Sequence, residues 1–196
     1  MKKYLVSILV ISVLTFVLVS IFSLQQFNQR RMLKKTPVET FYFNDLLQSS
    51  ISNECVEIIN PLVYKGNDTV NKNYFFDLIR DKTLVFRFSG EACNTCIEFA
   101  LEGLKKKFVD FATNDRILLI GSSINERIKE HYYGKPVISF YSSNLGIPIE
   151  EYNIPFMFIA DKDRIVKMIF VPEKTMPELY ELYLNTVYER YFSGSQ

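Results

Sequence analysis

The sequence predicts an α/β fold, in which a central mixed sheet is flanked by helices and preceded by one N-terminal transmembrane helix. Three observations predict it. Residues 4–24 form an uncharged, strongly apolar run. Residues 117–121 form a short apolar run with charged or small residues at its ends, which is typical of a strand buried on both faces of a parallel sheet. Residues 97–108 carry apolar side chains four, three and four positions apart, which is the period of a helix with one buried face.

Composition indicates one ordinary globular domain. The chain has 196 residues, of which 48% are hydrophobic, and a net charge of +1. Seventeen Phe and twelve Tyr indicate a packed aromatic core. Near-neutral charge gives no electrostatic basis for binding nucleic acid. We expect a membrane anchor over residues 1–29, a juxtamembrane linker over 30–57 that is helical around 38–47, and a folded domain over 58–196.

The apolar run is long enough to cross a bilayer. Its 21 residues, Tyr4 to Leu24, would rise about 31 Å as a helix. A cleaved signal peptide is the alternative, but the run is long for a signal and no small-x-small site closes it. The flanking charges are two lysines before the span and four basic residues after it, which taken alone would place the domain in the cytoplasm. The very short basic N-terminus is instead typical of a signal anchor with an exported domain. The basic residues are Lys2, Lys3, Arg30, Arg31, Lys34 and Lys35.

The elements of the domain follow in order. A hairpin is predicted over 61–70, a short helix over 73–79 and a strand over 83–88. A helix begins around Cys93 with the buried stripe Ile97, Leu101, Leu104 and Phe108. After the strand at 117–121 come a helix over 124–132, a strand over 137–141 and a helical turn over 148–152. A hairpin over 156–160 and 165–171 precedes a last helix, with Thr175 as its cap and Leu179, Leu182, Tyr183 and Val187 along one face.

Two of the three cysteines, Cys93 and Cys96, lie in the motif Cys-Asn-Thr-Cys at the start of the predicted helix. A thiol at a helix N-terminus is stabilised as thiolate by the positive end of the helix dipole. The second thiol, one turn further along, can attack a mixed disulfide formed by the first. We therefore predict Cys93 as the attacking residue and Cys96 as the resolving residue, with no cofactor.

A metal site is the rival interpretation of the pair. Structural zinc takes four ligands. The chain could add only Cys55 and His131, which lie in no second ligand pair. Covalent haem needs His directly after the second cysteine, where Ile97 stands. We therefore expect no metal, Cys55 as a buried or idle thiol, and His131 as a surface residue.

The segment from Phe88 to Cys96, together with Ile154 and Pro155, resembles the thioredoxin superfamily in its membrane-anchored thiol-disulfide oxidoreductase and redoxin-like branch. The resemblance implies a thioredoxin-like fold and a cis peptide before Pro155, which would lie beside the cysteine pair. It also implies that Ile154 and Pro155 contact an extended substrate chain. Protein thiols and disulfides would be the partners, at the bacterial inner membrane with the domain facing the periplasm and a membrane electron donor in reach.

The sequence departs from that family near the pair. Ala92 stands where an aromatic residue is usual, and Arg87 stands where relatives often place a buried acid or amide. Arg87 either points at the pair, where it would stabilise the thiolate, or faces solvent. Glu91 would oppose thiolate formation if it faced the pair, and is otherwise a solvated loop charge.

Two functions follow from these residues. The first is a thiol-disulfide oxidoreductase acting on exported proteins, more often as reductant than as oxidant. The second is a thioredoxin-fold binding or scaffold module with little redox turnover. The departures from the family pattern at Ala92 and Arg87 are the reason to consider this second function. A peroxidase is not supported, because such enzymes place Thr three residues before the reactive cysteine, whereas Ser89 lies four before Cys93.

Overall fold

The computed structural model describes residues 44, 47–65, 71–122, 128–140 and 144–194. The chain divides into two compact units, Met1–Asp45 and Leu46–Gln196, and the description below concerns the second. The predicted membrane anchor lies outside the described residues. Among the residues that are described, no helix combines the length and the apolar content needed to cross a membrane.

The domain is built on one mixed sheet of eight strands. Its order is β2-β1-β6-β4-β3-β7-β8, with β5 paired to β6 alone. The three central strands β6, β4 and β3 run parallel, and the strands on both sides of them run antiparallel. The strands are β1 (Leu62–Lys65), β2 (Lys72–Tyr74), β3 (Thr83–Ser89), β4 (Ile117–Ser122), β5 (His131–Tyr132), β6 (Lys135–Phe140), β7 (Phe156–Ala160) and β8 (Lys167–Phe170). The helices are α3 (Phe75–Leu78), α4 (Asn94–Lys107), η1 (Pro148–Tyr152), α5 (Pro177–Val187) and η2 (Tyr188–Phe192).

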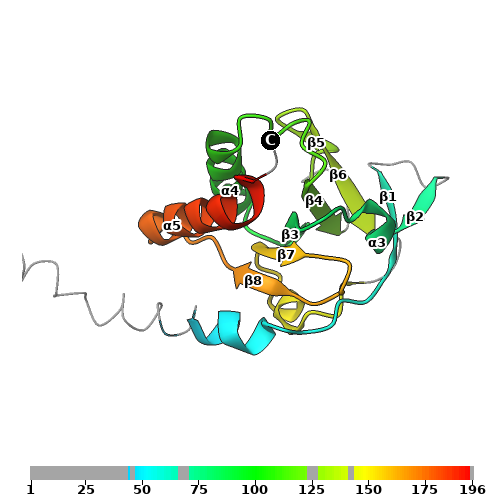
Figure 1. The fold of residues 1–196 in the computed structure, drawn as a ribbon, viewed down its shortest axis with the longest axis horizontal. Helices are drawn as coiled ribbons and strands as arrows, with labels where there is room; N and C mark the ends of the chain where they lie inside the picture. Colours follow the sequence, from blue (N-terminus) through cyan, green and yellow to red (C-terminus); the bar gives the residue numbers. More distant parts are fainter. Residues whose placement is uncertain (1–43, 45–46, 66–70, 123–127, 141–143, 195–196) are drawn as a thin grey trace, which may run out of the picture. The chain divides into compact units, whose positions relative to one another are not determined.

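Each face of the sheet carries its own hydrophobic core. Alternation along β3 sends Leu84, Phe86 and Phe88 to the face covered by α4 and α5, which lie side by side in Figure 1. Val85 goes to the opposite face, where α3, η1 and the neighbouring loops cover it. Because both faces are covered, the central strand β4 is apolar on both faces, and this is the continuous pattern seen at residues 117–121. The α/β architecture expected from the sequence, with helices on both sides of a mixed sheet, is confirmed.

Most predicted elements are present, with three shifts. The hairpin forms between β1 and β2 (Lys72–Tyr74), and the strand predicted at residues 69–70 lies outside the described residues. The helix predicted over 124–132 is wrong for its last residues, since His131 and Tyr132 form β5, paired with β6. The last helix begins one residue later than predicted, with Met176 at the cap position and no side-chain cap from Thr175. Its buried face contains Tyr180, Tyr183, Leu184 and Val187, whereas Leu182 is exposed.

The peptide bond before Pro155 is trans, so the cis bond expected from the family resemblance is wrong. The chain turns instead at Asn153, which adopts a left-handed conformation with φ 53° and ψ 27° at the end of η1. After that turn the chain enters β7 through the lower-energy isomer of an X-Pro bond.

Part of the predicted linker belongs to the domain. Residues 47–53 are helical, and Asn53 accepts a hydrogen bond from the Ile149 backbone N–H at 2.9 Å. Glu54 accepts hydrogen bonds from the backbone of Met168 and Ile169 in the edge strand β8. These contacts cover the edge of β8, and the compact unit therefore begins at Leu46, ahead of the boundary at 57/58 that the sequence suggested.

Candidate thiol-disulfide site

Cys93 occupies the N-cap position of α4, directly after the loop that leaves β3. Its carbonyl accepts the first hydrogen bonds of the helix, from the backbone N–H groups of Cys96 at 2.9 Å and Ile97 at 3.0 Å. The Cys93 thiol is exposed, and the Cys96 thiol one turn later is partly buried. Cys93 is therefore the more accessible of the two thiols, as predicted.

The two thiols differ strongly in acidity. Hydrogen bonds from the Cys96 thiol and from Thr95 lower the pKa of Cys93 from 9.0 to about 7. Burial, together with the interaction with Cys93, raises the pKa of Cys96 from 9.0 to about 11. At neutral pH about half of Cys93 is therefore thiolate, whereas Cys96 keeps its proton and donates it in a hydrogen bond to that thiolate. This is the division of roles that a nucleophile and a resolving thiol require.

Three further residues act on the pair and were missed by the sequence analysis. The Thr95 Oγ1 lies 3.2 Å from the Cys93 Sγ, and the hydroxyl must be the donor when Cys93 is a thiolate. Lys174, in the loop between β8 and α5, lowers the pKa of both cysteines by its positive charge. The neighbouring Glu173 raises the pKa of Cys96, and burial raises the pKa of Glu173 itself. Thr95 was readable as a hydroxyl inside the motif, whereas Lys174 lies 78 positions after Cys96 and gives no local signal.

Arg87 takes neither of the two positions considered for it. It is buried on the sheet face opposite α4, and its Nε donates to the Glu150 Oε1 at 2.8 Å. Its guanidinium lies 4.8 Å from the centre of the Phe140 ring. The alternation along β3 explains this, because Arg87 lies between Phe86 and Phe88, which both face the helices.

Glu91 lies in the loop before Cys93, and Ile154 and Pro155 follow Asn153 in the segment that leads into β7. Glu91 is exposed and accepts a hydrogen bond from the Asn153 Nδ2 at 2.8 Å. Ile154, the next residue, is 37% exposed, whereas Pro155 is buried. The hydrogen bond brings the segment before β7 against the loop before Cys93, which unites two parts of the chain that are 62 positions apart.

The remaining candidates lie elsewhere. Cys55 was expected to be a buried or an idle thiol; it is exposed, which contradicts the first of these alternatives and leaves the second untested. It adopts a left-handed conformation (φ 62°), and its N–H donates to the Val166 carbonyl. His131 is a surface residue of β5, as predicted. Within the part of the chain that the structure describes, no three or more His, Cys, Asp or Glu side chains gather as a metal site.

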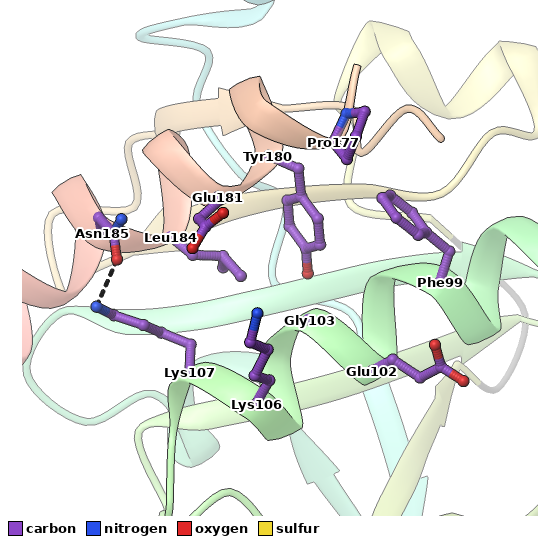
Figure 2. A pocket seen from close by; sticks show the side chains of 10 residues that line it. All are labelled: Phe99, Glu102, Gly103, Lys106, Lys107, Pro177, Tyr180, Glu181, Leu184 and Asn185. Carbon is purple, nitrogen blue, oxygen red and sulfur yellow. Dashed lines mark hydrogen bonds between the residues drawn. The ribbon is translucent and has the colours of Figure 1, made fainter. Parts of the chain in front are cut away.

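A groove of about 430 Å³ lies between α4 and α5, and neither cysteine lines it (Figure 2). The Tyr180 ring forms part of its wall and donates its hydroxyl to the Ala100 carbonyl. Lys107 crosses between the helices to the Asn185 Oδ1 at 2.6 Å. Gly103 permits the close approach, because a Cβ there would lie 2.3 Å from the Tyr180 ring. We interpret the groove as the seam between two packed helices.

No protein-family model and no curated protein matches the chain. Among solved structures, a thioredoxin-like protein from Porphyromonas gingivalis is 16% identical, with a TM-score of 0.46 over 71% of this chain and 97% of that one. A thiol:disulfide interchange protein DsbE from Chlorobium tepidum is 8% identical, with a TM-score of 0.43 over 68% and 98%. A mitochondrial 2-Cys peroxiredoxin from Plasmodium falciparum is 13% identical, with a TM-score of 0.39 over 69% and 94%. At such low identity, the activities named for these proteins remain statements about them alone.

Proposed function

We propose that this chain is a thiol-disulfide oxidoreductase that reduces disulfides of exported proteins through the Cys93–Cys96 dithiol. One observation carries the proposal. An exposed thiol with a pKa of about 7 caps a helix, and a protonated thiol with a pKa of about 11 follows one turn later. A nucleophile whose pKa is near the working pH combines a large thiolate fraction with high intrinsic reactivity.

The reaction follows from this arrangement. The Cys93 thiolate attacks one sulfur of the substrate disulfide, forms a mixed disulfide with it, and expels the other substrate sulfur as a thiolate. Cys96 then loses its proton and attacks the Cys93 Sγ, which releases the second substrate sulfur as a thiolate. The substrate gains two electrons and takes up two protons, while Cys93 and Cys96 become a disulfide. A dithiol donor must return two electrons to the pair after each turn.

Insulin reduction with dithiothreitol as the donor tests the activity. We expect the full chain to accelerate precipitation of the insulin B chain, and Cys93→Ser to abolish the acceleration. Cys55→Ser is the matched control, because Cys55 is also an exposed cysteine but is no part of the pair, and it should keep full activity. Absence of acceleration by the wild-type chain would favour the binding-module alternative.

Trapping separates the roles of the two cysteines. Cys96→Ser should allow attack but stop release, so that mixed disulfides with substrate proteins accumulate on non-reducing gels and disappear on reduction. Cys93→Ser should trap little, because Cys96 is less exposed and its pKa is raised to about 11. Equal trapping by both variants would show that the assigned order is wrong.

We also propose that residues 4–24 anchor the chain in the bacterial inner membrane, with the domain on the periplasmic side. The apolar length of that run and its short basic N-terminus support the proposal. Carbonate extraction should leave the chain in the membrane pellet, and protease added to spheroplasts should digest the domain. Release of a shortened soluble protein would contradict the anchor, and protection of the domain until lysis would contradict the orientation.

A further inference from the structure

The turn between β8 and α5 lies beside the start of α4. Pro177, the first residue of α5, lines the groove between the two helices together with Phe99 (Figure 2). The centre of the Phe99 ring lies 5.4 Å from the centre of the Tyr180 ring in the first turn of α5. Phe99 follows Cys96 in α4 by about one helical turn. The first turns of the two helices are therefore adjacent, and residues 173–176, which precede Pro177, lie close to the cysteine pair.

Lys174 in this turn places a positive charge beside both thiols. Lys174 is exposed, and besides the hydrogen bonds and the burial described above, its charge acts on the pKa of both Cys93 and Cys96 and lowers each. Among the residues that the structure describes, Lys174 forms no ion pair, so its ammonium group is available to a ligand. The first turn of α4 contains no acidic residue, and Glu98, the first acid of that helix, pairs with Lys129 at 3.4 Å. The positive end of the α4 dipole therefore adds to the charge of Lys174.

Two acidic residues also lie near the pair, but neither is placed to cancel this charge for an incoming substrate. The Glu91 carboxylate accepts a hydrogen bond from the Asn153 Nδ2 at 2.8 Å, which directs it toward the segment before β7. Glu173 is less exposed than Lys174, and burial raises its pKa, which favours its uncharged form. The charge of Glu173 acts on Cys96, the less exposed thiol. A substrate that approaches the exposed thiol therefore meets Lys174 as the exposed charge of this turn.

We propose that Lys174 determines the substrate preference of the exchange reaction, and that the preferred substrates are polypeptides with acidic side chains beside their cystine. The inference rests on the proposed function. In the first step the Cys93 thiolate forms a bond to one cystine sulfur, and the bond between the two cystine sulfurs breaks. The negative charge passes from Cys93 to the sulfur that leaves as a thiolate. Because no charge is created in this step, a fixed charge beside the pair discriminates substrates by the charge that they bring with them.

The Cys93 thiolate by itself would favour the opposite kind of substrate. Its negative charge repels a carboxylate beside the cystine and attracts an ammonium group there. Interactions between exposed charges are weak and similar in size, so one lysine beside the thiolate offsets this repulsion, and the positive end of the α4 dipole adds to its effect. Removal of the lysine should therefore reverse the preference for acidic substrates as well as weaken it.

Two disulfide-linked peptides of equal length test the inference, one with Asp on both sides of each cysteine and one with Lys there. The second-order rate constant for release of the peptide thiol by the reduced full chain is measured with each peptide, in a Cys55→Ser background. We expect the chain with Lys174 to react about threefold faster with the acidic peptide, and Lys174→Gln to lower this ratio of rate constants about fivefold, in the range that one exposed ion pair provides. Lys174→Gln should thus bring the ratio below one. Lys174→Glu should lower it further, and Lys174→Arg should keep it.

The ratio of rate constants isolates the charge of the substrate from other effects of the lysine. Lys174 also changes the thiolate fraction of Cys93, but that fraction is the same for both peptides and cancels in the ratio. The two peptide thiols differ as leaving groups, and this difference is the same for every variant. The preference for the acidic peptide should also decline as salt is added, because the charges concerned are exposed.

Lys162→Gln is the matched control. Lys162 is also an exposed lysine, in the turn after β7, and the pairing of Thr83 with Ala160 places that turn at the end of β3 remote from the cysteine loop. This variant removes the same charge and should keep the original ratio. Equal rates for the two peptides, a ratio that Lys174→Glu leaves unchanged, or a ratio that Lys162→Gln lowers equally would overturn the role of Lys174 but not the oxidoreductase. A chain that releases thiol from neither peptide would overturn both.

Discussion

Replacing Thr95 by Val should make Cys93 a weaker acid. The change removes a hydroxyl 3.2 Å from the Cys93 Sγ and puts a methyl group of similar size in its place. A hydrogen bond to a charged acceptor stabilises it by about 1.5–3 kcal/mol when shielded. Because Cys93 is exposed, about 1 kcal/mol is the appropriate figure here. That corresponds to a factor of about five in the thiolate equilibrium, since 1.4 kcal/mol is a factor of about ten.

The consequence is a pH-dependent loss of reactivity. With a pKa of about 7, the wild-type Cys93 is about half thiolate at pH 7. A fivefold decrease of the thiolate equilibrium constant lowers the thiolate fraction at pH 7 to about one sixth. Alkylation of Cys93 by iodoacetamide should therefore slow about threefold at pH 7. At pH 10 it should hardly slow, because Cys93 is then almost fully thiolate in both proteins. The rate is read by mass spectrometry of the Cys93 peptide in a Cys55→Ser background, which removes the other exposed cysteine.

Thr95→Ser is the control for this prediction, because it keeps the hydroxyl and should restore the wild-type profile. A Val variant whose alkylation profile overlays the wild type from pH 5 to 10 would refute the role of the hydroxyl. In that case the Cys96 thiol, together with the helix N-terminus and the Lys174 charge, would account for the low pKa of Cys93 without Thr95.

Three stability predictions follow from the buried contacts, each measured by denaturant unfolding. Arg87→Met should cost about 3–5 kcal/mol by leaving the Glu150 charge buried and unpaired, and adding Glu150→Gln should recover part of it; a loss below about 1 kcal/mol would contradict this. Gly103→Ala should cost about 1–3 kcal/mol, because its Cβ would fall 2.3 Å from the Tyr180 ring; an unchanged midpoint would mean that the helices separate freely. Burial lowers the pKa of Lys135 from 10.5 to about 8. Between these two pH values the Lys135 side chain is therefore protonated in the unfolded chain but neutral in the folded one. The free energy of unfolding of the wild type should then rise relative to that of Lys135→Met as the pH goes from about 8 to 10.5. A constant difference between those two proteins across that range would exclude the shift.

The segment around Cys93 and Cys96 is one region where sequence patterns were sufficient. The strand before the cysteines, the helix after them and the buried stripe at Ile97, Leu101 and Leu104 all appear where the patterns put them. The strand Phe156–Ala160 matches its predicted bounds. These features depend on spacings of two to four residues, which the chain displays locally. The hydrogen bonds that lower the pKa of Cys93 are also local, because they come from Thr95 and Cys96 within the same motif.

The surroundings of the pair depend on contacts between distant residues, and here the sequence was not sufficient. The partner of Arg87, Glu150, lies 63 positions away in η1. The alternation along β3 shows that Arg87 lies on the opposite face from Phe86 and Phe88, but only the tertiary structure shows which of the two faces α4 and α5 cover. The approach of Lys174 depends on how α5 docks, which no local pattern encodes. The buried face of α5 was predicted wrongly at Leu182, which is exposed. The reason is the same: this helix carries apolar side chains on more than one side, so its sequence alone does not show which side packs against the sheet.

The sequence by itself therefore determined the α/β fold class, the position of the cysteine pair at a helix start and which of its two cysteines is the more exposed, because each depends on short-range spacing. Only the tertiary structure decided what neighbours the pair has, that Cys55 is exposed, and that the chain turns at Asn153 and keeps a trans bond before Pro155. The physical reason is that burial and ion pairing are properties of packed surfaces. A side chain acquires them from residues on other elements, and the identity of those residues is fixed only when the sheet and its covering helices come together.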